Sequence, residues 1–154
     1  MAIICTSIAN HSLRSEVCFD ILKSMKKYWH GAHTTHRHMY HIVWLPKYRK
    51  RILESNVKKR VDEVLREVAQ INGWDIQELN IQLEHVHLMI QIPPSISVSH
   101  AVQFLKGRSS KVVREEMPEL KKFLWGSSFW ADGYFSVTVG EVSEEKIREY
   151  IQNQ

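Results

Sequence analysis

The chain has 154 residues, of which 44% are hydrophobic and 25% are charged. This length and balance suit one folded domain and do not favour a disordered chain. Lys and Arg number 21 against 17 for Asp and Glu, and the resulting net charge of +4 permits a nucleic-acid partner without requiring one. No apolar run approaches the roughly 20 residues of a membrane-spanning helix. Cys5 and Cys18 have no metal-ligand spacing and suggest no disulfide framework, so the simplest interpretation is a cytoplasmic protein without a membrane partner.

The first part of the chain differs from the rest. Residues 1–24 lack a hydrophobic period and precede a second methionine, Met25, without forming the apolar core of a secretory signal. We expect residues 1–24 to be an N-terminal extension and residues 25–154 to be the functional domain. Residues 28–38 are rich in histidine but have no recognisable ligand spacing, and we expect an irregular lead-in there.

Hydrophobic periodicity predicts the elements that follow. Pro46 ends a first strand, Gly73 lies just beyond a first helix, and Ser97 is a suitable N-cap for a second. In chain order, we expect a strand over 38–45, a helix over 54–70, strands over 75–83 and 84–92, a helix over 97–117, a strand over 129–139 interrupted by a turn at Asp132-Gly133, and a last helix capped by Ser143.

This order predicts an α+β fold of the ferredoxin-like, split βαβ type. Its antiparallel sheet carries helices on one face and leaves the other face open, and a C-terminal helix is added at the end. A binding face on the open side of the sheet would be natural, although the fold alone does not fix a function.

The most informative motif is His85-Val86-His87, which lies in an apolar run. Side chains alternate across a strand, so the two imidazoles should share the open face while Val86 faces the core. Two adjacent imidazoles can hold one divalent metal ion. The alternative is a solvated polar face without a metal.

The last helix carries Tyr150 and Gln154 at i and i+4, on one helix face. A tyrosine hydroxyl close to a metal ion can attack a phosphodiester, and the Gln154 amide oxygen could complete a mixed N/O ligand set with the two histidines. Such a set suits Mg²⁺ or Mn²⁺ better than a cysteine-rich zinc site would. The alternative for Tyr150 is a core aromatic, and Tyr134 is a rival nucleophile.

Two basic clusters suit contact with phosphate groups, because cations alternate with aromatic or hydroxyl side chains. The first is Lys47-Tyr48-Arg49-Lys50-Arg51, and the second is Lys106-Gly107-Arg108-Ser109-Ser110-Lys111. We select Lys47, Arg49, Lys106, Arg108 and Ser109 as candidate DNA-binding residues. Solvated charged surfaces are the alternative.

Together these stretches resemble the single-tyrosine HUH transposases of the IS200/IS605 insertion-sequence type. The resemblance extends in one consistent order from about Tyr40 to Gln154. It is carried by the segments Tyr40–Arg49, Glu84–His87, Leu105–Ser110, Phe129-Trp130, Gly133–Phe135, Thr138–Gly140 and Tyr150–Gln154.

The resemblance implies a function for each part of the motif. His85 and His87 correspond to the family's metal ligands, Gln154 to a further ligand, and Tyr150 to the nucleophile. The family cuts and rejoins single-stranded DNA at hairpin ends through a 5′-phosphotyrosine link, as a homodimer whose tyrosine helix docks in trans on the partner's histidines.

The sequence departs from the family in three places, the first of which is the unusual N-terminal extension over residues 1–24. Glu84 stands where relatives usually have Asp, which should affect ligation little. Relatives commonly continue beyond the tyrosine helix, and this leaves open whether the chain is a truncated, weakly active copy.

Three other functions stay open. A non-catalytic ferredoxin-like module that binds nucleic acid would need neither Tyr150 nor Gln154 in this arrangement. A zinc hydrolase would need a third His or Cys ligand and a glutamate base in an HExxH frame, and the sequence shows no such frame. A relative that processes genomic palindromes shares the same motifs.

Overall fold

The computed structural model describes residues 28–30, 33–124 and 128–154, and the chain divides into two units, 1–37 and 38–154. In the first unit, strands β1 (Trp29–His30) and β2 (Thr35–His36) form an antiparallel pair where the sequence predicted an irregular lead-in. The predicted extension over residues 1–24 and the predicted domain start at Met25 lie outside the described residues.

The second unit contains a four-stranded antiparallel sheet in the order β4-β5-β3-β6. Its strands are β3 (Met39–Trp44), β4 (Asp75–Ile81), β5 (Val86–Gln91) and β6 (Phe135–Thr138). Helix α2 (Ser55–Ile71) connects β3 to β4, and α3 (Val98–Glu116) lies between β5 and β6. Two short 3₁₀ helices follow β3 and α3, at Lys47–Arg49 and Pro118–Lys122. The predicted ferredoxin-like fold is confirmed.

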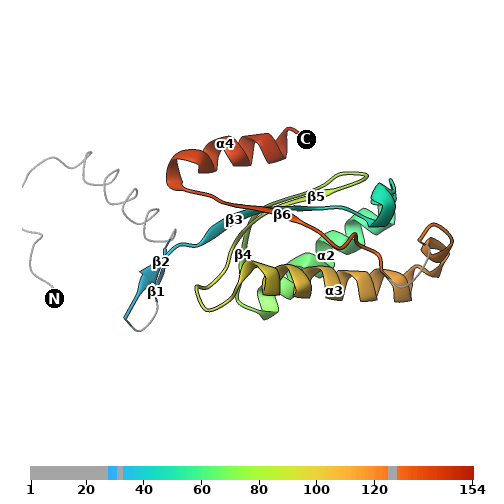
Figure 1. The fold of residues 1–154 in the computed structure, drawn as a ribbon, viewed down its shortest axis with the longest axis horizontal. Coiled ribbons are helices and arrows are strands. Elements are labelled where there is room, and N and C mark those ends of the chain that lie inside the picture. Colours follow the sequence, from blue (N-terminus) through green and yellow to red (C-terminus); the bar gives the residue numbers. More distant parts are fainter. Residues whose placement is uncertain (1–27, 31–32, 125–127) are drawn as a thin grey trace, which may run out of the picture. The chain divides into compact units, whose positions relative to one another are not determined.

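Helices α2 and α3 cover one face of the sheet and enclose the main core (Figure 1). Alternate residues of the two central strands point into this core, because side chains alternate across a strand. Its fully buried members from these strands and the two helices include Ile42, Leu88, Ile90, Val61, Val64, Leu65, Leu105 and Val113. The apolar stripes predicted from the sequence are therefore the faces that the helices and sheet bury against each other.

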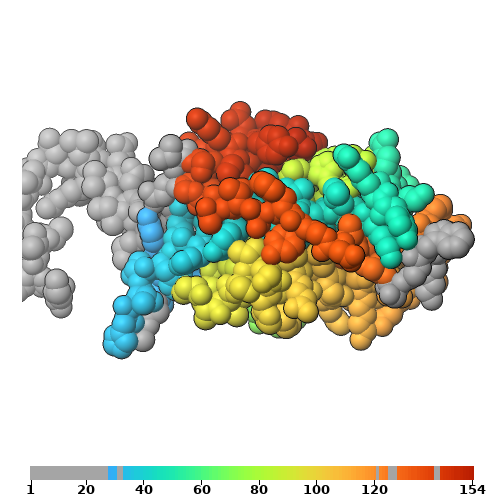
Figure 2. Space-filling view, in the orientation of Figure 1, coloured from blue at the N-terminus to red at the C-terminus, as the bar shows by residue number. Residues whose placement is uncertain are grey.

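The last helix, α4 (Glu141–Gln152), lies on the opposite face of the sheet from α2 and α3 (Figure 1). Figure 2 shows it as a continuous ridge along one side of the domain. A second, small apolar cluster lies beneath it, formed by Met39, Met89, Val139 and Ile151. The face that the sequence predicted to be open is thus covered in part by the chain's own last helix.

Element boundaries differ most from the prediction in the last part of the chain. The strand predicted over 129–139 begins only at Phe135, and Trp130 instead forms an isolated bridge with Pro46. Helix α4 begins two residues before the predicted cap: its N-cap is Gly140, and the Ser143 hydroxyl donates back to the Gly140 carbonyl. The prediction for α3 is confirmed, since Ser97 is the N-cap and its hydroxyl accepts from the His100 amide at 3.2 Å.

None of the described helices is both long and apolar enough to cross a membrane.

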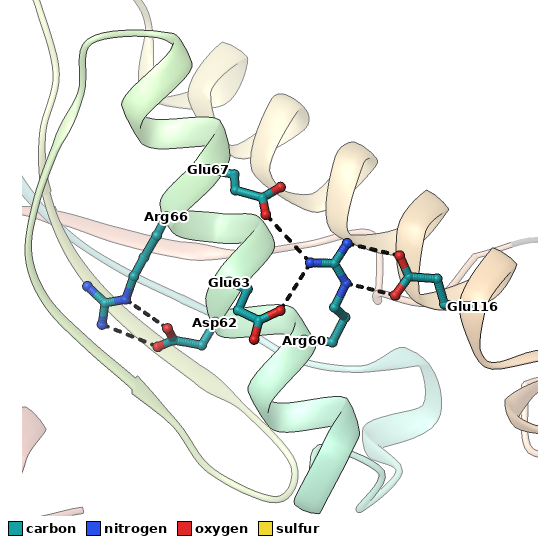
Figure 3. Close-up of polar contacts among 6 residues, drawn as sticks. All are labelled: Arg60, Asp62, Glu63, Arg66, Glu67 and Glu116. Carbon is teal, nitrogen blue, oxygen red and sulfur yellow. Dashed lines mark hydrogen bonds and ion pairs between the residues drawn. The ribbon is translucent and has the colours of Figure 1, made fainter.

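An ion-pair cluster joins the two helices of the main layer (Figure 3). The Arg60 guanidinium on α2 donates to both carboxylate oxygens of Glu116 on α3, at 2.7 and 2.9 Å, and also faces Glu63 and Glu67. The Arg60 hydrogen bond lowers the pKa of the Glu116 carboxyl below its ordinary 4.5. The lowered pKa means that the folded state favours the ionised carboxylate, so this pair stabilises the fold only while Glu116 is charged.

We therefore predict a pH-dependent effect of Glu116→Gln. The substitution should lower the free energy of unfolding slightly at pH 7, and the difference from the unmodified chain should shrink as the pH falls below the ordinary carboxyl value of 4.5. Urea unfolding at a series of pH values measures this. Glu115→Gln is the matched control, because Glu115 reaches Lys111 only at 4.0 Å on the exposed side of α3. An equal loss in both variants, or a loss that persists in acid, would contradict the prediction.

Candidate active site

The His85-Val86-His87 motif stands at the start of β5, in the middle of the sheet. His87 lies in the strand, opposite Val43 of β3 and Asn80 of β4. His85 lies just before the strand and not within it as predicted, because its carbonyl accepts from the Gln82 amide in the β4–β5 connection. The two rings nevertheless meet edge to face, with centroids 4.8 Å apart.

His87 is buried, with 5% of its surface exposed. This corrects the expectation of an open face, and the physical reason is the position of α4 over that side of the sheet. Burial, with smaller contributions from the neighbouring His85 and His41, lowers the pKa of His87 to about 4. The imidazole is consequently uncharged near neutral pH and keeps a nitrogen lone pair that can bind a metal ion.

A third histidine joins this pair, and the sequence analysis did not select it. His41 of β3 is 7% exposed, and its Nε2 lies 3.1 Å from Nδ1 of His87, with the two rings stacked. Burial also lowers the pKa of His41. The signal that could have found it is the alternation in the first strand: if Tyr40 and Ile42 face the helices, His41 must face the same side as His87.

Tyr150 lies next to the histidines within the same chain. Its ring centroid is 5.7 Å from that of His87, in an edge-to-face arrangement, and about half of the tyrosine is exposed. The ring is therefore accessible to a large substrate while it contacts the buried imidazole. Tyr134, the rival, lies before β6 at 40% exposure, and among the described residues it has no contact with the three histidines.

Contacts on both sides of Tyr150 hold it in place. Ile151 is fully buried against Met39, Met89 and Val139. The Asn80 amide donates to the Ile151 carbonyl at 2.5 Å, which satisfies one of the free carbonyls in the last turn of α4. One helical turn earlier, Arg148 donates to Gln77 of β4 at 3.4 Å. The strand next to His87 thus fixes the helix that carries the tyrosine.

The proposed metal ligands are only partly assembled. His85 and His87 are adjacent, whereas Gln154 is exposed beyond the end of α4 and has no hydrogen bond to either histidine. Within the described part of the chain, no group of three or more His, Cys, Asp or Glu side chains is arranged to hold a metal ion. The two adjacent imidazoles fit part of a ligand set, and an amide oxygen is a type of donor that would extend it. The Gln154 ligand stays a prediction.

The second basic cluster has a structural role that the sequence did not reveal. The Lys106 ammonium donates to the carbonyls of Ala131, Asp132 and Gly133, at 2.6 to 3.3 Å, and burial lowers its pKa. Ser109 is fully buried, donates to the Leu105 carbonyl and accepts from the Trp130 indole. Because its hydroxyl has no exposed surface, we assign Ser109 a packing role in place of the predicted contact with DNA.

The other candidate DNA-binding residues are accessible. Arg108 is exposed on α3. Lys47 is half-buried, and its ammonium lies 5.4 Å from the ring centroid of Tyr48. Arg49 is exposed and pairs with Glu84 at 3.2 Å, which places it next to the residue that precedes His85. Contact of these residues with DNA stays a prediction.

Comparisons with known proteins identify a family. Residues 34–154 match the family model described as "Transposase IS200 like". The ISDra2 transposase TnpA of Deinococcus radiodurans is 33% identical over 115 residues, which is 75% of this chain and 82% of the relative. The transposase for insertion sequence element IS200 of Salmonella typhimurium is 36% identical over 123 residues, 80% of each chain.

Two solved structures share the fold. A crystal structure of a protein from Deinococcus radiodurans, assigned provisionally as a transposase, superposes with a TM-score of 0.69 at 31% identity and covers 82% of this chain and 97% of that one. A REP-associated tyrosine transposase bound to a REP hairpin superposes with a TM-score of 0.53 at 12% identity, over 80% of this chain and 67% of the other. The latter likeness concerns the fold alone.

The packing of α4 gives a prediction for stability. Ile151→Ala removes buried methyl and methylene groups from a small cluster, so it should lower the free energy of unfolding by about 2–5 kcal/mol and loosen the contact between Tyr150 and His87. Urea unfolding measures the first effect, and hydrogen exchange of the α4 amides measures the second. Ile147→Ala is the control: Ile147 is only half-buried, and its loss should cost less. Equal losses in the two variants would contradict the central role of Ile151.

Proposed function

Because this chain belongs to the IS200-like transposase family, we propose that it cuts and rejoins single-stranded DNA at insertion-sequence ends, with Tyr150 as the nucleophile. The observation that carries the proposal is the contact between Tyr150 and His87, whose ring centroids lie 5.7 Å apart although the residues come from different elements. A half-exposed tyrosine beside the uncharged His87 imidazole supports this chemistry, because a tyrosine nucleophile acts next to a metal-binding group.

The proposed reaction exchanges one phosphoester for another. The Tyr150 oxygen attacks the phosphorus of a phosphodiester and gives up its proton to solvent, and the bond from phosphorus to the 3′ oxygen breaks. The 3′ oxygen takes a proton and leaves as a hydroxyl, while the 5′ phosphate stays on the tyrosine. Attack by a 3′ hydroxyl on the phosphotyrosine rejoins strands, and no external energy source is needed because one ester replaces another.

The role of a metal ion belongs to the same proposal. His85 and His87, with Gln154 as a further ligand, would hold Mg²⁺ or Mn²⁺, which would draw negative charge away from the phosphate. The observations that support this are the adjacency of the two imidazoles and the burial of His87. The fold supplies the positions of the reacting groups: the sheet orients His87, and α4 holds Tyr150 beside it.

We propose that the DNA partner is a single strand with hairpin ends. The REP-associated relative was solved bound to a hairpin, and the present chain shares its fold. Exposed cations on α3 and on the turn after β3, including Arg108 and Arg49, are suited to contact the phosphate backbone. A module that binds DNA without cutting it is the alternative, and the Tyr150–His87 contact has no function in that case.

The nucleophile is tested with matched tyrosine variants. Tyr150→Phe removes one oxygen and keeps the ring, so the fold and DNA binding should persist while the covalent protein–DNA adduct disappears, a loss of at least about 100-fold. The assay is a labelled single strand carrying the element end, incubated with Mg²⁺ and resolved on a denaturing gel. Tyr134→Phe is the control and should keep the adduct. An adduct that survives Tyr150→Phe but not Tyr134→Phe would show that the nucleophile is misassigned.

The DNA contact is tested through its salt dependence. Arg108→Ala should weaken binding to all sequences and reduce the slope of log K against log salt by about one unit, because one phosphate contact is lost. Fluorescence anisotropy over a salt series measures the slope. Arg66→Ala is the control, since that guanidinium is engaged by Asp62 on α2. A slope that Arg108→Ala leaves unchanged would count against contact at this position.

We also propose that the active form is a homodimer with sites shared in trans, as the family resemblance implies. In the single chain, Tyr150 lies beside its own His87, and an exchanged α4 could make the same contacts on a partner's sheet. Mixing a His87→Ala chain with a Tyr150→Phe chain should restore cleavage, because one of the two shared sites then contains both intact residues. If the chains exchange and no activity returns, each chain uses its own tyrosine, through the contact between Tyr150 and His87 of the same chain.

A further inference from the structure

We propose that His41 is a positioning residue for His87: its Nε2 accepts a hydrogen bond from Nδ1–H of His87 and thereby leaves Nε2 of His87 unprotonated. This inference rests on the proposed function, because it explains how one of the two ligand histidines acquires the correct tautomer. It concerns a residue that touches neither the tyrosine nor the substrate in the proposed reaction.

The placement of His41 follows from the register of the two central strands. His41 lies opposite Met89, and His87 lies opposite Val43, so the two histidines are diagonal neighbours on one face of the sheet. Diagonal neighbours are within reach of long or aromatic side chains. The ring planes differ by 11° with centroids 5.3 Å apart, and the Nε2–Nδ1 distance of 3.1 Å is a normal hydrogen bond.

The rings of His41 and His87 each contact further aromatic side chains, which restrict the rotation that would break the hydrogen bond between them. His41 packs edge to face against Phe135, with centroids 6.4 Å apart, while His87 contacts His85 and Tyr150. Since His41 is 7% exposed and His87 is 5% exposed, water has little access to replace either partner. A buried polar group without its partner would destabilise the fold, so the pair persists in the folded state.

The direction of the hydrogen bond decides what His87 can do. Two imidazole nitrogens at this distance need one N–H donor and one lone-pair acceptor. If His41 donated, Nδ1 of His87 would be the acceptor and Nε2 would carry the hydrogen, and no lone pair would remain for a metal ion. If His87 donates, Nε2 keeps its lone pair, and among the described residues this nitrogen has no hydrogen-bond partner. Only the second arrangement agrees with ligation by His87, and orientation of a ligand histidine through its other nitrogen is a general feature of metal sites.

The first test reads the tautomer directly in the full, metal-free chain. Nitrogen NMR with ¹⁵N-labelled histidine near pH 7.5 distinguishes protonated from unprotonated ring nitrogens. We expect His87 to carry its hydrogen on Nδ1 and to have an unprotonated Nε2. A spectrum with the hydrogen of His87 on Nε2 would overturn the inference, whether or not the protein later binds metal.

The second test separates positioning from packing. His41→Leu fills the space without an acceptor, whereas His41→Gln offers an amide oxygen close to the position of Nε2. We expect the affinity for Mn²⁺, measured from the electron paramagnetic resonance signal of the free ion, to fall about 10- to 100-fold in His41→Leu and to recover largely in His41→Gln. Circular dichroism and the urea midpoint check that both variants fold. If His41→Leu does not fold, the NMR measurement of the His87 tautomer in the unmodified chain tests the inference by itself.

The outcomes separate this inference from the proposed function. His85→Ala is the reference, because it removes a proposed ligand itself. If His85→Ala weakens Mn²⁺ binding and His41→Leu does not, the metal site stands and the role of His41 is wrong. If the unmodified chain binds no Mn²⁺ while His87 carries its hydrogen on Nδ1, the metal part of the proposed function fails and the positioning by His41 stands.

Discussion

The site depends on one packing contact, the burial of Ile151 of α4 against the sheet face opposite α2 and α3. Helix α4 has only 12 residues, and isolated helices shorter than about 12–15 residues are marginally stable in water. Ile151 occupies the small cluster with Met39, Met89 and Val139, and Asn80 secures the carbonyl beside it. Because Tyr150 precedes Ile151 in the chain, the helix that is held by Ile151 must present the tyrosine close to His87.

On the sheet face beneath α4, burial of polar groups is energetically unfavourable. His41 and His87 occupy buried positions where apolar side chains would pack with less desolvation. The sheet compensates by pairing the two rings with each other. Burial also lowers the pKa of both imidazoles and so favours their uncharged forms. An uncharged His87 keeps the lone pair that the proposed metal site would use. Departures of this kind from an apolar core are expected where function requires them.

The basic segment on α3 shows that a motif can combine two roles. Lys106 connects α3 to the loop of Ala131 to Gly133, and Ser109 holds the Trp130 indole from the same helix. These contacts fix the segment that leads into β6, the strand that pairs with β3 on the side away from β5. The neighbouring Arg108 is exposed, and its contact with DNA is a proposal. In this short segment, Lys106 and Ser109 make contacts within the fold, whereas Arg108 places a positive charge on the surface.

The sequence by itself determined the fold class and the residues of the central motif. Periodicities of two and of about 3.6 residues are local properties, so the order of strands and helices, the Ser97 cap and the alternation around His87 could be predicted. The tertiary structure alone decided which groups meet. His41 and Asn80 are separated from His87 in the chain but lie on neighbouring strands, and only the strand register brings them to its side. The burial of Ser109, the three carbonyls around Lys106 and the cover of α4 over the sheet likewise arise from long-range packing, which no local pattern encodes.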